Sequence, residues 1–132
     1  MRMYRAVSLV LMLLFAMTGV LFLGFPDAPI AFFNALSPSF GMPPAPASGR
    51  DFYLILAVGY MYLVTVLAFL MFRHPENRHF PLLLVHAKLA SSVLSLAPFL
   101  LQAHYLIYLA NFAIDGVIGI VVLTMYLRMR RA

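Results

Sequence analysis

The sequence has no cysteine and no tryptophan, and only 10% of its 132 residues are charged. The absence of cysteine excludes disulfide bonds, thiolate metal sites and cysteine nucleophiles. The absence of tryptophan leaves tyrosine as the main side chain for anchoring at a membrane–water boundary. A soluble domain has about a quarter of its residues charged. A chain this poor in charge and 64% hydrophobic cannot cover a water-facing globule with polar side chains, so we predict that lipid surrounds most of it.

Four apolar stretches are long enough to cross a bilayer as helices. A membrane-spanning helix needs about 20 mainly apolar residues, and runs of that length lie at about 6–25, 52–72, 81–101 and 104–127. We therefore predict an all-α polytopic membrane protein, built as one domain and folded as an antiparallel bundle of four transmembrane helices. The very short turn at 102–103 requires the third and fourth helices to be antiparallel neighbours.

The arginines are distributed unequally between the two ends of these spans. Only Arg50 falls at one end. The others all fall at the opposite end: Arg2, Arg5, Arg73, Arg78, Arg128, Arg130 and Arg131. The positive-inside rule then predicts that both termini and the 73–80 loop face the cytoplasm of a bacterial cell, with 26–50 outside. Because helix ends account for the positive charge, no soluble basic surface remains for nucleic acid.

The external segment 26–50 contains the signals of a short helix. Asp27 can cap a helix whose first turn holds Pro29, and Ile30, Phe33 and Leu36 then recur at helical spacing. We predict one to two turns lying in the membrane interface with the apolar face down. The alternatives are a loop resting on the mouth of the bundle and a lid over a cavity.

One lysine lies inside the third apolar stretch. A lysine in hydrocarbon costs roughly 2.5–3.5 kcal/mol on insertion scales, so Lys88 needs water or an anion. Asp115 is the only acid in the fourth stretch. From the helical rise, Lys88 lies roughly 11 Å and Asp115 roughly 18 Å from the same end of the bundle. Two side chains can bridge that difference in depth, so the sequence predicts a direct or water-bridged ion pair.

Further polar side chains share the helix faces of this pair. Asn111 precedes Asp115 by four residues and lies on its face, and Ser92 and Ser95 continue the face of Lys88. Tyr60 of the second span needs a partner for its hydroxyl. The candidate site therefore comprises six residues: Lys88, Asp115, Asn111, Ser92, Ser95 and Tyr60. It is either a structural pair that fixes helix register or a binding site for a polar headgroup, a small metabolite or a proton.

Catalytic motifs are absent from the sequence. No metalloprotease or serine-hydrolase motif occurs. His86 and His104 fall near opposite sides of the membrane, which argues against a haem held by two histidines. Ser92 could reach Lys88 as a dyad, but serines in membrane helices more often bond to their own backbone. We therefore expect no cofactor, and we do not predict an enzyme.

In span number, size and short cytoplasmic loops the chain resembles small four-helix membrane families such as the DoxX-like and the sterol-isomerase-like (EXPERA) proteins. The resemblance is one of layout and assigns no residue a role; an isomerase of that kind needs paired acids, where this chain offers only Asp115. We expect a protein that binds or moves a lipid or small amphiphile. The alternative is a non-catalytic subunit of a larger membrane complex. The expected partners are membrane lipids and other membrane subunits or a second copy.

Overall fold

The fold is helical throughout the part of the chain that the computed structural model describes, residues 2–46 and 51–131, with side chains at 2–46 and 53–129. The helices are α1 (Arg2–Gly24), α2 (Ala28–Leu36), the short 3-10 helix η1 (Ser37–Phe40), α3 (Asp51–Arg73), α4 (His79–Leu101) and α5 (Leu106–Arg131). The predicted lone arginine of the external end, Arg50, lies outside the described residues. The observed elements confirm the all-α fold class.

Four of these helices, α1, α3, α4 and α5, are long and apolar enough to cross a membrane. This confirms the four-helix membrane architecture. The helix bounds differ from the predicted spans at several places. α1 already begins at Arg2 and α4 at His79, and α5 begins only at Leu106 and continues to Arg131. The late start of α5 arises because the chain turns through backbone hydrogen bonds from the amide of Ala103 to Pro98 and from that of Tyr105 to Ala103, which lengthens the connection after α4.

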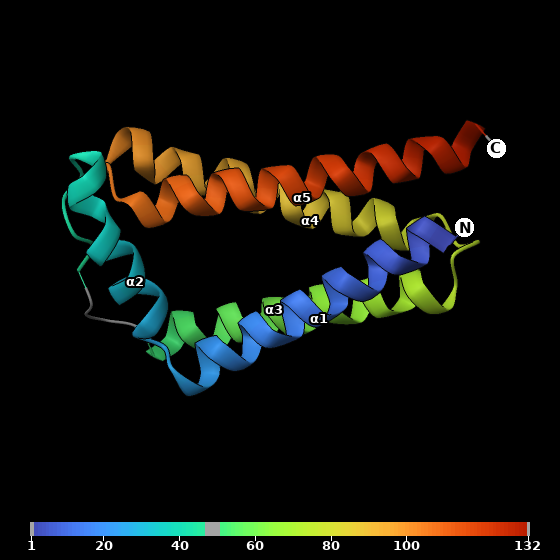
Figure 1. The fold of residues 1–132 in the computed structure, drawn as a ribbon, viewed down its shortest axis with the longest axis horizontal. Coiled ribbons are helices and arrows are strands. Elements are labelled where there is room, and N and C mark those ends of the chain that lie inside the picture. The colour runs from blue at the N-terminus through green and yellow to red at the C-terminus, as the bar shows by residue number, and fades with distance from the viewer. Residues whose placement is uncertain (1, 47–50, 132) are drawn as a thin grey trace.

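The four long helices associate as two antiparallel pairs, α1 with α3 and α4 with α5 (Figure 1). The two pairs converge at the end of the molecule where both termini lie, and they diverge toward the opposite end. There α2 crosses from the α1–α3 pair to α5 (Figure 1). The bundle is therefore closed at one end and splayed at the other, a feature that the sequence does not predict.

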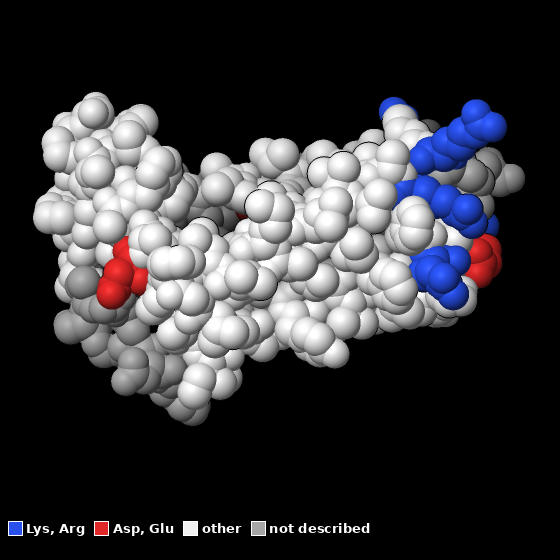
Figure 2. Space-filling view, turned by 60° about the horizontal axis from the view of Figure 1, so that its bottom comes forward, with Lys and Arg blue, Asp and Glu red and all other residues white. Residues whose placement is uncertain are grey.

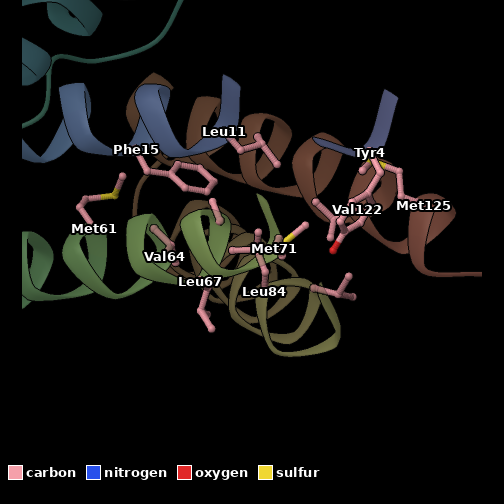
Figure 3. Packing of buried hydrophobic residues seen from close by; sticks show 12 residues of the cluster. Tyr4, Leu11, Phe15, Met61, Val64, Leu67, Met71, Leu84, Val122 and Met125 are labelled. Atoms are coloured by element: carbon pink, nitrogen blue, oxygen red, sulfur yellow. The ribbon is translucent and has the colours of Figure 1, made fainter. Parts of the chain in front are cut away.

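The buried apolar core lies in the half where the pairs converge. Its central side chains are Phe15 of α1, Val64 and Met71 of α3, Leu84 of α4 and Val122 of α5 (Figure 3). Each of the five is at most 2% exposed. In a membrane such contacts stabilise through van der Waals packing, since lipid removes most of the hydrophobic driving force. The dense packing of this half therefore fixes how the two pairs meet.

Two glycines allow α4 and α5 to approach closely. A Cβ atom on Gly119 would lie 2.7 Å from Leu89 Cδ2, and one on Gly116 would lie 3.0 Å from Ser92 Oγ. Both distances are too short for ordinary contacts, so a side chain at either position would force Leu89 or Ser92 to shift. Small residues at helix crossings are typical of membrane bundles. This close approach sets the separation between the faces that carry Lys88 and Asp115.

The predicted short helix in the external segment is present as α2. It is followed by η1 and by a turn at Gly41, whose φ of 65° falls in the left-handed region. The Asn34 side chain then holds the following segment in place: its Nδ2 donates to the Ala45 carbonyl at 2.9 Å, and its Oδ1 accepts from the Ala45 amide at 2.7 Å. The segment from α2 to Ala45 is thus a folded cap rather than a loose loop.

Candidate functional site

The structure brings Lys88 and Asp115 into direct contact. Lys88 Nζ donates to Asp115 Oδ1 at 2.9 Å, and the two side chains are 3% and 7% exposed. Their meeting agrees with the expectation from the helical rise, because two long side chains can bridge the difference in depth between antiparallel neighbours. A charge at this depth is tolerable only when it is paired. Because each charge offsets the other, both side chains can stay buried inside the bundle.

Two aromatic rings from the other helix pair cover the ammonium group of Lys88. Its Nζ lies 4.4 Å from the ring centroid of Phe15 on α1 and 5.0 Å from that of Tyr60 on α3. Both distances are within the range of cation–π attraction. Lys88 on α4 thus contacts α1, α3 and α5. A single buried cation connects the two helix pairs where they converge.

Phe15 is the contact that sequence reasoning missed. The first predicted span contains no charged residue that would single out a position in it. A signal was present: the buried residues Tyr4, Ser8, Leu11 and Phe15 recur every three to four positions, which is the spacing of one helix face. In a helix that is apolar on all sides, however, that spacing does not distinguish the protein-facing stripe from lipid-facing ones.

Hydroxyl groups of α4 continue the polar site beyond the ion pair. Ser92 Oγ donates to the Phe112 carbonyl of α5 at 2.8 Å. Asn111 Nδ2 donates to Ser95 Oγ and, at 3.3 Å, to Ser91 Oγ. These bonds join α4 to α5 toward the splayed end of the bundle. All three residues that were predicted beside the pair on these helices, Ser92, Ser95 and Asn111, therefore take part in hydrogen bonds between α4 and α5.

Tyr60 contributes to the site from α3. Its hydroxyl donates to the Ala87 carbonyl of α4 at 3.2 Å, and Ser91 lies beside the same hydroxyl. The bond to Ala87 crosses between the two helix pairs. Tyr60 therefore both covers Lys88 with its ring and joins α3 to α4 with its hydroxyl. With it, all six residues of the predicted site take part in side-chain contacts between helices.

The site is buried at one end and open at the other. Asp115 is buried, whereas Asn111, one turn earlier on the same face of α5, is exposed. Figure 2 shows a largely uncharged surface that is hollowed beside the end formed by α2, with the basic side chains gathered at the opposite end. Asn111 is thus a polar residue of the site that remains exposed, one helix turn from the buried ion pair.

Some other polar residues of the described chain do not bond to the residues of the site. Thr65 donates to Met61 of its own helix, and Thr18 does the same to Leu14. His86 and His104 are exposed. Within residues 2–46 and 51–131, no cluster of three or more histidine or acidic side chains could hold a metal ion.

An apolar groove adjoins the site on the α1–α3 pair. Its volume is about 260 Å³. It is lined by Phe15, Ala16, Gly19, Val20, Leu23, Val58, Met61, Tyr62 and Thr65. Phe15 belongs both to this groove and to the ring contacts of Lys88. The groove therefore offers a purely apolar surface directly next to the buried cation, large enough for part of a hydrocarbon chain.

Comparison with known proteins adds no relative to this description: no protein-family model, no curated protein and no solved structure matches the chain.

Proposed function

We propose that the protein binds or moves a lipid or small amphiphile, whose polar head occupies the site around Lys88 and Asp115. The observation that carries the proposal is the exposed Asn111, which donates to Ser95 and Ser91 beside Tyr60, one helix turn from the buried Asp115. Polar groups facing hydrocarbon without a partner are costly. A polar head entering between the diverging helix pairs would supply that partner.

The apolar surroundings suit the remainder of such a molecule. The groove beside Phe15 offers contacts for a hydrocarbon chain, and hydroxyl and amide groups lie one helix turn from the ion pair. Pockets for small molecules are mostly apolar with a few placed polar groups. The site has this composition. Lys88 and Asp115 then act chiefly by holding the two helix pairs at the correct separation around the head.

The proposed orientation places both termini in the cytoplasm of a bacterium. Its support is the gathering of arginines at the end that carries the termini (Figure 2), together with the positive-inside rule. In this orientation the splayed end and α2 face outward. The ligand would then enter from the outer leaflet or from the external solution.

The second candidate, a non-catalytic subunit of a larger complex, is favoured by one specific observation. Several large apolar side chains project outward from the helices, among them Met17 at 72%, Tyr62 at 73% and Leu94 at 70% exposure. Such surfaces can contact lipid or another membrane protein. The ion pair would then be architectural, because its charges satisfy each other without a ligand.

Native mass spectrometry tests the two candidates on protein extracted gently from its own membrane. Ligand binding predicts a single chain with a reproducible small-molecule adduct. The adduct should be lost in the Lys88→Met/Asp115→Leu double variant, which removes the polar centre without leaving an unpaired charge. Gly59→Ala is the matched control, since no atom lies within 4 Å of the added Cβ. A stable assembly with other chains, or equal adducts in wild type and double variant, would contradict the proposal.

A further inference from the structure

We infer that the headgroup bound at this site is uncharged and donates a hydrogen bond to Asn111 Oδ1, as the hydroxyl of a fatty alcohol or an acylglycerol does. This inference rests on the proposed function, because it assumes that an amphiphile occupies the site. It specifies which kind of headgroup binds at the exposed end of the site. Two features of the structure carry it: the orientation of the Asn111 amide and the charge balance around it.

The hydrogen-bond network fixes the orientation of the Asn111 amide. Ser95 Oγ donates its only hydrogen to the Ser91 carbonyl at 2.9 Å. The same oxygen can therefore only accept from Asn111, and an accepting partner requires the NH2 group of the amide on that side. Ser91 Oγ, 3.3 Å away, lies on the same side. The Asn111 carbonyl oxygen must then point away from α4.

That carbonyl oxygen is available to a ligand. Among the side chains and backbone groups of the described residues, no donor bonds to Asn111 Oδ1, and Asn111 itself is exposed. An amide oxygen is an acceptor only, so its natural partner is an O–H or N–H group. The site thus presents one free acceptor at the edge of an otherwise satisfied polar network.

The charge balance of the site disfavours a charged head. Lys88 is paired with Asp115, so its attraction for a carboxylate or phosphate is already offset. Asp115 is likewise engaged, and it is the only acid within the spanning helices as described, apart from Asp51 at the start of α3. A charged ammonium or carboxylate would therefore enter an apolar region without a counter-ion, at high desolvation cost. A neutral hydroxyl avoids that cost and fills the free acceptor.

The test compares four probes that share one hydrocarbon chain and differ only in the head: oleyl alcohol, oleic acid, oleylamine and the headless alkene with the same internal double bond. Each is titrated into delipidated wild-type protein in a neutral detergent, and occupancy is followed by native mass spectrometry. The alcohol should bind most tightly. In Asn111→Leu its dissociation constant should rise about tenfold toward that of the alkene, which is the loss expected for one hydrogen bond. Binding of the alkene, which lacks a head, should stay unchanged.

The outcomes separate this inference from the proposed function. Tighter binding of the acid or the amine would overturn the inference and leave an amphiphile site in place. If the alcohol binds wild type and Asn111→Leu with equal affinity, and binds both more tightly than the alkene does, then a group other than Asn111 bonds to the head. That result would also overturn the inference. Failure of wild type to bind any of the four probes would count against the proposed function itself. A matched Asn111→Gln variant, which keeps a carbonyl oxygen, should restore part of the preference for the alcohol.

Discussion

Removing one member of the Lys88–Asp115 pair should destabilise the protein far more than removing both. At 2.9 Å and an effective dielectric constant of about 20, the Coulomb attraction amounts to about 6 kcal/mol. Desolvation of the two charges offsets much of that attraction, so the intact pair contributes little net stability. Breaking it with Asp115→Leu leaves a buried ammonium and should cost about 3–5 kcal/mol.

The double variant Lys88→Met/Asp115→Leu carries no unpaired charge. Because apolar side chains of similar volume often replace a buried pair without loss, it should cost less than either single substitution. Lys88→Met should likewise cost more than the double variant, since it leaves Asp115 buried without its partner. The order of stability is thus fixed: wild type or the double variant first, then the two single variants.

The assay is reversible unfolding by sodium dodecyl sulfate in mixed micelles, analysed as a two-state transition. Distance between the helix pairs is followed through dyes on cysteines introduced at Met17 of α1 and Val117 of α5, which are 72% and 62% exposed. The native chain contributes no competing thiol. A double variant whose loss equals the sum of the two single losses would refute the reasoning, because the two side chains would then act independently.

Three further predictions follow from other parts of the molecule. Gly119→Ala should lower the free energy of unfolding by about 1–3 kcal/mol through overpacking against Leu89. Gly59→Ala, with no atom within 4 Å of the new Cβ, should be neutral or slightly stabilising in the same assay. Equal effects of the two substitutions would contradict the close approach of α4 and α5. In intact cells an impermeant maleimide should label Ser39→Cys and leave Glu76→Cys unlabelled, and the reverse pattern would invert the proposed orientation. Asn34→Ala should expose the segment around Ala45 to limited proteolysis without lowering the stability of the four long helices, and unchanged cleavage would show that its two hydrogen bonds are dispensable.

The polar part of the site was predictable because polar side chains are rare in this sequence. A lysine and an acid in neighbouring apolar stretches have few partners other than each other, and helical spacing places Asn111, Ser92 and Ser95 on the same faces. The short helix α2 was also predictable, since Asp27 and Pro29 mark its start. Each of these inferences depends on a local pattern or on the high cost of an isolated polar group in lipid.

The splayed arrangement and the role of Phe15 were not predictable by the same reasoning. Helices that are apolar on every side carry no sequence signal for which face meets protein and which meets lipid, because the two environments are similarly apolar. How four such helices pair, and at which end they separate, depends on side-chain shapes summed over many contacts. The start of α5 differs from the predicted position for a related reason. The turn after Pro98 is set by backbone hydrogen bonds that residue types alone do not reveal.

Because the two helix pairs converge at one end, a small rotation of one pair relative to the other has its largest effect at the splayed end. A helix of 23 residues such as α3 is about 35 Å long. A rotation of about 5° at the closed end would therefore displace the far end by about 3 Å while the ion pair hardly changes. α2 limits this displacement, because it is joined to α1 by a short connection and contacts α5. The separation of the two helix pairs at the splayed end can thus change while the core packing at the other end is kept.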